Sequence, residues 1–351
     1  MRSMQRICFV RQKSMYSSMG AHENEVRQLT AALFFFVVRF GTPFPALDFL
    51  RAKSLATHQK DSRMRSFMLA MLAVLPIAAA APTVSAQTIT ADGPVVYGHH
   101  HFNTTDMAAQ KRFFVETLGG KLATIGTNNL EVIEFPNVFL FFRPMQAPTG
   151  GTIGTTVNHV GFSVPDLKPV VAKLKANGFK MITSDSVAAT VKVTDDIAAA
   201  SPTTNIAFVL GPEDIKVELV EVKAQASPIQ LHHVHFFGEH REEMQAWYAK
   251  VFGAAAQPAN PNQAFVMATL PGVTLSFSPS PTATVPTQGR ALDHIGFEIK
   301  NLEAFTKKLE ADGIPLTVAY RRVDALNISI AFIKDPWGTN IELTEGLRAI
   351  K

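Results

Sequence analysis

The sequence NHVGF at residues 158–162 returns as DHIGF at residues 293–297. In both copies the apolar residues alternate with His and Gly, and side chains along a strand point alternately to opposite faces. His159 and His294 therefore share a face with a glycine, which leaves room beside the imidazole, while the apolar face is expected to pack on helices. We interpret the two stretches as equivalent strands of a repeated fold.

The repeat extends on either side of these strands. Residues His99–Phe102 align with His233–Phe236, and the closing pattern of Val217–Leu219 returns at Ile341–Leu343. Self-similarity over this length indicates two homologous halves of roughly 130 residues. We place the corresponding domains at 87–226 and 227–351.

Each half divides again into two similar units. A unit opens with a short β-branched and aromatic strand, continues with a helix and ends with two or three further strands. Each predicted helix has a polar or capping-type residue near its start and a glycine just past its end. The order β-α-β-β-β, four times over, predicts an α+β fold whose mostly antiparallel sheets carry helices on one face. The predicted helices span residues 106–118, 166–177, 240–252 and 301–312.

Histidines concentrate on the opening strands. Of the nine histidines between residues 87 and 351, eight lie in or beside such a strand. His99 and His101 share one face of their strand, and His233 and His235 share the matching face in the second half. In each pair, one member is a candidate metal ligand and the other a neighbouring group or an alternative ligand. The alternation alone does not choose between them.

Glu218 and Glu342 occupy the polar face of the closing strand in their halves. Each half is therefore expected to direct two histidines and one glutamate into one cup, from three strands. Two imidazoles and a carboxylate are the ligand set of an open divalent site, suited to Fe(II), Mn(II), Zn(II) or Ni(II). A single strand histidine is more often an ordinary buried or exposed residue. The recurrence of all three residue types at matching positions favours a metal, although common ancestry with loss of the site in one half also explains it.

The basic character of the chain belongs to its N-terminal part. The whole chain has a formal charge of +4, but residues 1–86 hold 11 Lys and Arg against four Asp and Glu, and the remainder holds 22 against 25. The predicted folded part therefore gives no reason to expect a nucleic-acid partner. Arg63–Arg65, the apolar stretch 67–81 and Val84–Ala86 follow the order of a signal peptide, which we assign to residues 64–86.

Export to the periplasm or the medium follows from this signal, with no stable membrane span once it is cleaved. We interpret residues 1–63 as an unstructured gene-model extension, with translation starting at Met64. The alternative is a real extension with an internal anchor. Cys8, the only cysteine, lies in this extension, so the mature chain has no thiol nucleophile.

The chain resembles the vicinal oxygen chelate superfamily, also called glyoxalase/bleomycin-resistance/dioxygenase. The resemblance covers about residues 95–347 and rests on HVHFF at 233–237, DHIGF at 293–297 and DPWGTNIEL at 335–343. It implies four modules paired into two half-barrel domains, each around a divalent metal that chelates two oxygens of a small-molecule substrate. By position it implies the ligands His99, His159 and Glu218 in the first half and His233, His294 and Glu342 in the second.

Departures from the family patterns limit the reaction. Glyoxalase I has a second glutamate on the last strand of a unit, whereas the strands here, VFLFF at 138–142 and VTLSF at 273–277, carry no carboxylate. This disfavours a lactoylglutathione lyase. Ring-cleaving dioxygenases have a similar two-domain plan, but their tyrosine position is Phe332 here, and no histidine lies between residues 295 and 335. Fosfomycin-type transferases share the ligand types but are normally dimers of single-domain chains.

We therefore expect an exported, metal-dependent protein that acts on a small oxygenated molecule by a dioxygenase-like or lyase/isomerase-like reaction. His235, or His101 in the first half, is the candidate for moving the proton. The alternative is a metal-free protein of the same fold that binds an antibiotic or another aromatic compound. A third possibility is that the first half is only a structural partner. The sequence carries no indication of an oligomeric state.

Overall fold

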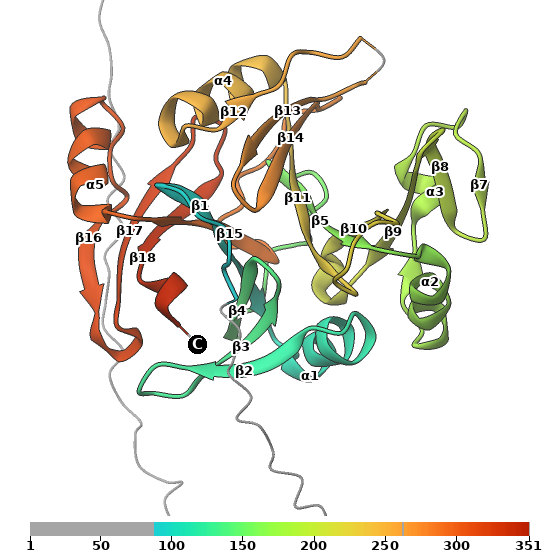
Figure 1. Ribbon diagram of the computed structural model, residues 1–351, viewed down its shortest axis with the longest axis horizontal. Coiled ribbons are helices and arrows are strands. Elements are labelled where there is room, and N and C mark those ends of the chain that lie inside the picture. The colour runs from blue at the N-terminus through green and yellow to red at the C-terminus, as the bar shows by residue number, and fades with distance from the viewer. Residues whose placement is uncertain (1–87, 262, 351) are drawn as a thin grey trace, which may run out of the picture. The chain divides into compact units, whose positions relative to one another are not determined.

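The computed structural model describes residues 88–261 and 263–350, which form two β-sheets with helices packed against them (Figure 1). The predicted signal peptide at 64–86 and the extension at 1–63 lie outside the described residues. None of the described helices is long and apolar enough to cross a membrane. The four predicted modules are all present, at 95–144, 157–221, 230–279 and 292–345, and we number them 1 to 4 in this order.

Modules 1 and 4 build one sheet of eight strands, here called sheet A. Its strands follow the order β16-β17-β18-β15-β1-β4-β3-β2. The strands of module 1 are β1 (Val95–Thr104), β2 (Lys121–Ile125), β3 (Leu130–Phe135) and β4 (Val138–Pro144). Those of module 4 are β15 (Leu292–Ile299), β16 (Val318–Val323), β17 (Ile328–Lys334) and β18 (Asn340–Glu345).

Modules 2 and 3 build the second sheet, here called sheet B, in the order β12-β13-β14-β11-β5-β10-β9-β8-β7, with β6 paired to β9. Module 2 supplies β5 (Val157–Val164), β6 (Lys180–Met181), β7 (Val193–Thr194), β8 (Ile197–Ser201), β9 (Thr204–Leu210) and β10 (Lys216–Glu221). Module 3 supplies β11 (Gln230–Gly238), β12 (Ala255–Ala256), β13 (Val266–Leu270) and β14 (Val273–Pro279).

Each module has its helix where the sequence predicts one. The helices are α1 (Met107–Lys111) with its π-helical continuation η1 (Arg112–Thr117), α2 (Leu167–Ala176), α4 (Arg241–Phe252) and α5 (Leu302–Ala311). The shorter elements are α3 (Thr183–Ser186), η2 (Pro212–Asp214), η3 (Asp324–Leu326) and η4 (Leu347–Ala349). Asp106, Asp166 and Asn301 cap α1, α2 and α5 by accepting backbone N–H bonds.

The expected pairing of modules within each half is wrong. β1 pairs antiparallel with β15, and β5 pairs antiparallel with β11, so each sheet takes one module from each half. The ranges 87–226 and 227–351 describe the repeat in the sequence, but each contributes to both sheets. β5 and β15 carry the same residue pattern, and so do β1 and β11, so the pattern cannot specify whether β1 pairs with β5 or with β15.

Two linkers carry the chain between the sheets. Residues 145–156 lead from module 1 in sheet A to module 2 in sheet B, and residues 280–291 lead from module 3 back to module 4. The linkers lie side by side, because Thr155 bridges Val285 in parallel and the backbone of Thr149 donates to Gly289. Modules 2 and 3 are joined directly by the short connection 222–229.

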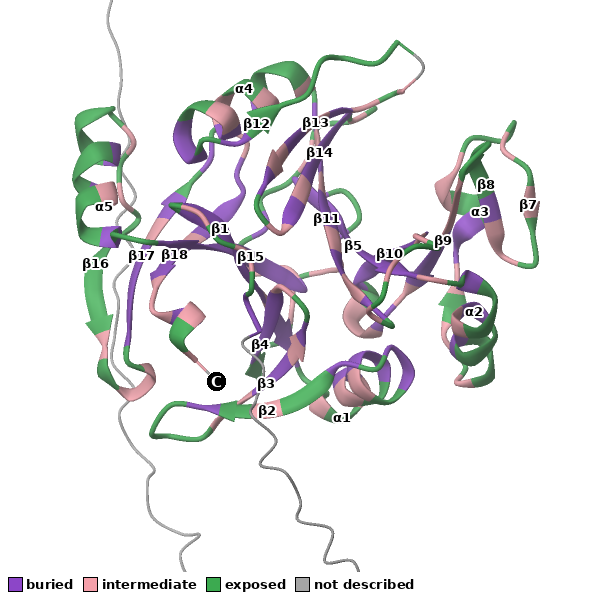
Figure 2. Ribbon diagram, in the orientation of Figure 1, coloured by how far each residue is buried: buried purple, intermediate pink, exposed green. Residues whose placement is uncertain are grey.

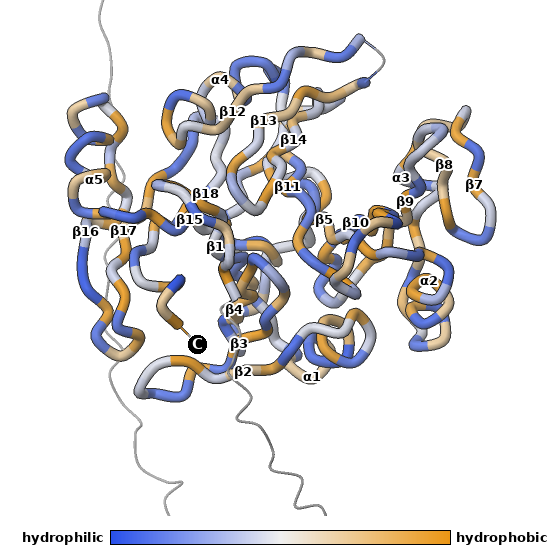
Figure 3. Tube along the Cα trace, in the orientation of Figure 1, coloured by the Kyte–Doolittle hydropathy of each residue, from blue (hydrophilic) through white to orange (hydrophobic). Residues whose placement is uncertain are grey.

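A common apolar core supports both sheets. β1 and β15 are almost wholly buried along their length (Figure 2). Helices α2, α4 and α5 each carry hydrophobic positions for the core and hydrophilic ones for solvent (Figure 3). The rings of Phe252 on α4 and Phe297 on β15 stack at 4.3 Å, and the Tyr248 hydroxyl donates to buried Asp335 at 3.0 Å. Module 3 thus packs against module 4 although the two belong to different sheets.

Coexpression of residues 88–226 and 227–350 as separate chains tests the exchanged pairing. With a tag on one chain only, we expect both to be recovered in equal amounts, because the β1–β15 and β5–β11 ladders join them. Either chain alone leaves two long strand edges unpaired and is expected to aggregate. Recovery of each half as a separate, folded monomer would contradict the pairing.

Candidate functional site

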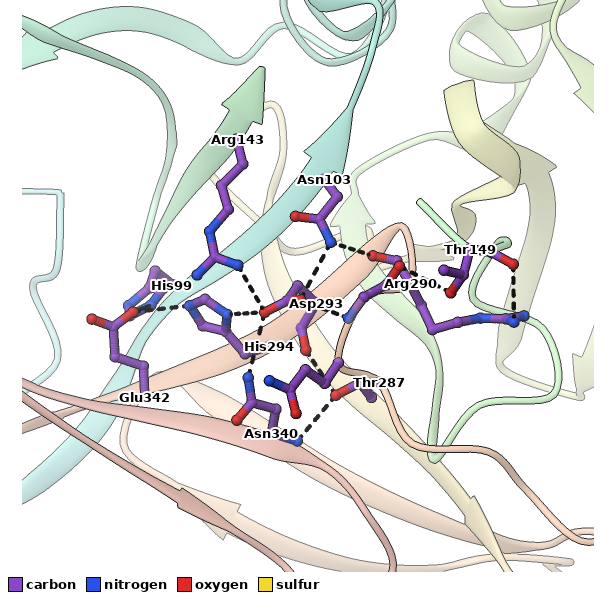
Figure 4. Close-up of polar contacts among 12 residues, drawn as sticks. His99, Asn103, Arg143, Thr149, Thr287, Arg290, Asp293, His294, Asn340 and Glu342 are labelled. Carbon is purple, nitrogen blue, oxygen red and sulfur yellow. Dashed lines mark hydrogen bonds and ion pairs between the residues drawn. The ribbon is translucent and has the colours of Figure 1, made fainter. Parts of the chain in front are cut away.

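Four side chains with metal-binding groups meet on the open face of sheet A, and we call this place cup A. His99 and His101 come from β1, His294 from β15 and Glu342 from β18, and one donor atom of each lies within 4.8 Å of the others. The Nε2 atoms of His99 and His294 lie 3.0 and 2.9 Å from the same oxygen of Glu342 (Figure 4). Three strands therefore aim three groups at one point.

Sheet B carries the matching arrangement, here called cup B. It consists of His159 on β5, Glu218 on β10 and His233 and His235 on β11. The Nε2 atoms of His159 and His233 lie 2.8 and 3.2 Å from one oxygen of Glu218. The two cups thus have the same ligand types at equivalent strand positions.

All six predicted ligands take part in these clusters, but the predicted grouping is wrong. His99 was expected with His159 and Glu218, and the structure brings it to His294 and Glu342 instead. His233 likewise joins His159 and Glu218. The reason is the exchanged pairing, since β1 and β11 each lie against a strand from the other half.

The glycine next to each ligand strand has a specific steric role. Gly296 pairs with His99 in the β1–β15 ladder, and Gly161 pairs with His233 in the β5–β11 ladder. A Cβ atom at Gly296 would lie 2.0 Å from Cε1 of His99, and one at Gly161 would lie 2.1 Å from Cε1 of His233. Each imidazole therefore lies directly over a glycine of the neighbouring strand. Glycine thus makes room for a histidine, but for one on the neighbouring strand and not, as expected, for His159 or His294 on its own strand.

The residues of cup A fit a divalent cation. Ligand atoms that share an ion at ~2.1 Å, with angles near 90°, lie ~3 Å from one another, as the Nε2 and carboxylate oxygen atoms do here. In addition, Nε2 of His101 is buried and has no hydrogen-bond partner among the described residues. In cup B, by contrast, Nε2 of His235 is hydrogen-bonded to Ser278 Oγ at 2.8 Å. Cup A therefore has a spare buried donor atom that cup B lacks.

Burial and pairing set the charge of these groups. Burial lowers the pKa of His101 and of His235 well below its usual value, so both imidazoles are neutral near pH 7. Burial alone would raise the pKa of Glu342, but its hydrogen bonds to His294 and His99 outweigh this and lower it. Burial likewise opposes ionisation of Glu218, and its two histidines lower its pKa overall. Ionised glutamate and neutral imidazole are the forms that bind a metal.

The two cups differ in the group behind one histidine. Nδ1 of His294 is hydrogen-bonded to the carboxylate of Asp293 at 2.7 Å, whereas Nδ1 of His159 is bonded to the amide oxygen of Asn158 at 3.0 Å. Burial lowers the pKa of His159 to about 4. It also acts to lower the pKa of His294, but the hydrogen bonds that Asp293 and Glu342 accept from the ring raise it overall. A carboxylate behind a ligating histidine fixes its tautomer and strengthens it as a donor.

The role of Asp293 was not predicted from the sequence. Strand alternation directs Asp293 to the face opposite His294, yet its carboxylate accepts a hydrogen bond from Nδ1 of the His294 ring. The backbone N–H of Gly289, in the linker between the sheets, holds the carboxylate at 2.7 Å, and Asn103 donates to it at 3.3 Å (Figure 4). The signal was present in the sequence as the Asn-to-Asp difference between NHVGF and DHIGF.

The strands beside the opening strands carry no further ligand. On β4, Phe139 and Phe141 pair with His99 and His101, and on β14 the equivalent positions are Thr274 and Ser276. The absence of a carboxylate here agrees with the sequence prediction. The ring of Phe141 instead stacks on His101 at 5.8 Å. Phe332, at the tyrosine position of ring-cleaving enzymes, lies 5.2 Å from His294. Aromatic rings therefore shield cup A.

A cavity of about 390 Å³ opens beside cup A, with His101 and Glu342 in its wall. Its volume lies in the range of small-molecule sites. Its other lining residues are Arg143, Gln288, Asp293, Thr317, Val318, Arg321, Ile330, Phe332, Lys334 and Asn340.

Comparison with known proteins agrees with this architecture. Residues 230–343, modules 3 and 4, match the family described as the Glyoxalase/Bleomycin resistance protein/Dioxygenase superfamily. No curated protein matches the sequence. Glyoxalase I from Zea mays is 16% identical, with 73% of this chain and 94% of that chain covered and a TM-score of 0.56. A putative dioxygenase from Bacillus subtilis is 11% identical, with 71% and 84% covered and a TM-score of 0.54. At these identities the two structures share the fold.

Gly296→Ala tests the steric constraint on His99. The added Cβ displaces the ring from Glu342, so we expect cup A to lose at least about tenfold in affinity for a divalent ion while far-UV circular dichroism stays unchanged. Gly98→Ala, on β1, is the matched control, because its Cβ would approach no atom closer than 3.4 Å. Equal metal affinity in the two variants would contradict the role of Gly296.

A reciprocal exchange tests the group behind the histidine. We expect Asp293→Asn to weaken metal binding in cup A by about 10- to 100-fold and Asn158→Asp to strengthen it in cup B. Competition with a chelator measures both, each in a protein whose other cup is disabled by Glu218→Gln or Glu342→Gln. Unchanged affinities in both variants would show that the acid has no influence on the ligand.

Proposed function

Since residues 230–343 match the glyoxalase/bleomycin resistance protein/dioxygenase superfamily, we propose that this protein is a metal-dependent enzyme that transforms a small oxygenated molecule in cup A. The observation that carries the proposal is the convergence of His99, His294 and Glu342 beside an open cavity. A bound divalent ion would polarise two oxygens of the substrate as a Lewis acid.

The other residues of cup A have separate roles in the proposed reaction. Asp293 holds the His294 ring, with Nε2 aimed at the ion. Phe141 and Phe332 keep water from one side of the cup. His101 is a neutral imidazole in the cavity wall, with a buried nitrogen that has no partner among the described residues. It is therefore available either to complete the ligand set or to take a proton from the substrate.

Two reaction classes suit this arrangement, each on its own observation. Two histidines and one carboxylate on one face are the ligands of non-haem oxygenases, which supports a dioxygenase-like reaction. A neutral histidine beside the ligands supports proton transfer in a lyase- or isomerase-like reaction. The lack of a carboxylate on β4 counts against a lactoylglutathione lyase.

Cup B is proposed to be the secondary site. It has the same ligand types, but an amide stands behind His159 and the spare nitrogen of His235 is bonded to Ser278. Both halves of the chain contribute to both cups. We therefore replace the hypothesis of a purely structural first half by that of a less active cup B. Export through residues 64–86 stays a prediction, and an exported location favours zinc or manganese over easily oxidised ferrous iron.

Metal content and activity of single-ligand variants test the proposal. The purified protein is expected to retain at least one equivalent of a divalent metal, and less than about 0.2 equivalents would favour the metal-free binding protein. His294→Ala is expected to remove the metal of cup A and to abolish turnover of catechols or 2-oxo aldehydes. His159→Ala, its matched variant in cup B, is expected to keep turnover within about threefold. Equal losses in the two variants would contradict a special role for cup A.

A further inference from the structure

The cavity beside cup A is lined by three cations. Arg143 on β4, Arg321 on β16 and Lys334 on β17 lie in the same wall as His101 and Glu342. They come from three strands of sheet A. They also gather on a part of the chain in which acids outnumber bases, because residues 87–351 hold 22 Lys and Arg against 25 Asp and Glu.

The acids of this cavity offset its cations only in part, because two carboxylates, Asp293 and Glu342, stand against three cationic side chains. Both of its carboxylates are committed to histidines, Asp293 to His294 at 2.7 Å and Glu342 to His99 and His294 at 3.0 and 2.9 Å. Arg143 reaches Asp293 only at 3.4 Å, at the limit of a hydrogen bond. A metal ion would add positive charge to the same space. The cavity is therefore electrostatically prepared for an anion.

Of the three cations, Arg321 and Lys334 form no ion pair with any described residue. The Lys334 ammonium donates to the neutral amide oxygen of Gln288 at 3.2 Å. The Arg321 guanidinium makes no hydrogen bond or ion pair with any residue in the described ranges. Its neighbour Arg322 is bonded to Asp324 and to Asn327. Adjacent arginines on one strand thus have opposite roles, one tied to the protein and one directed to the cavity.

Cup B lacks all three cations at the equivalent strand positions. The strand registers place Ser278 where cup A has Arg143, Leu210 where it has Lys334 and Ala198 where it has Arg321. Cup B has a lysine of its own, Lys216, but the ammonium lies over the ring of Phe208 at 4.4 Å. Two cups with the same ligand types therefore differ in the charge of their walls. The three cations are therefore a feature of cup A that the repeat itself does not impose.

We propose that the substrate of cup A is an organic acid, with a pair of chelating oxygens at one end and a carboxylate at the other. The carboxylate is held by Arg321 and Lys334, because a guanidinium fork matches a carboxylate in shape and charge. Val318, Ile330 and Phe332 line the same cavity and contact the apolar body between the two ends. The inference rests on the proposed function for the chelating end, while the carboxylate end depends only on the cavity.

Matched pairs of probes test this substrate class. Catechol and 3,4-dihydroxybenzoate share a chelating end, as do lactate and malate, and the second member of each pair adds a carboxylate. We expect the purified protein to bind the second member at least about tenfold more tightly, as measured by titration calorimetry. Arg321→Gln combined with Lys334→Gln is expected to remove this preference and to leave the affinity for catechol and lactate unchanged. Arg322→Gln is the matched control and is expected to keep the preference.

Three results would overturn the inference. One is no preference for the added carboxylate in the unmodified protein, including binding of none of the four probes. Another is a preference that survives the double substitution. The third is an equal loss in Arg322→Gln, which would indicate a general surface effect. Failure of the proposed function gives a different result. A protein that holds no metal but still binds the acids more tightly would support the carboxylate site and contradict the metal-dependent function.

Discussion

Both cups depend on one steric relation, an imidazole that lies over a glycine of the neighbouring strand. The His99 ring lies so close to the Cα of Gly296, and the His233 ring so close to that of Gly161, that a side-chain methyl group at either glycine would overlap the ring. The histidine and the glycine come from different halves of the chain, so neither half can form a cup by itself. The strand ladders, the linkers and the shared core therefore all serve to bring these two residue types together.

Much of this architecture could be predicted from the sequence. The repeat, the β-α-β-β-β order and the helices follow from periodicity and from the recurrence of NHVGF as DHIGF. The choice of His99 over His101 and of His233 over His235 as ligands came from the family resemblance. The pairing of modules could not be predicted, because β5 and β15 have the same pattern and either could pair with β1. The cations of the cavity were also missed. Arg321 and Lys334 gain their meaning from strands whose register no local pattern reveals.

The two cups show how a site can change while its ligand types stay constant. Replacing an amide by a carboxylate behind one histidine changes its strength as a donor, without touching the ligand atoms. Replacing small and apolar wall residues by cations changes what the cavity attracts. Both kinds of change are found in cup A, which also has the unpartnered nitrogen of His101. The ligands set what is possible in both cups, and the surrounding residues separate one cup from the other.

The exchanged pairing has a consequence for how such a chain can arise. A shorter protein with only one half would leave the edges of both its opening strands open, and a second identical molecule is the partner that fits them. Two such molecules would form a symmetric pair with two identical pockets. Joining them end to end through a connection such as 222–229 preserves every contact and makes the two pockets independently mutable. Asn158 and Asp293, equal in position and unequal in charge, are a divergence that two copies of one identical subunit could not show.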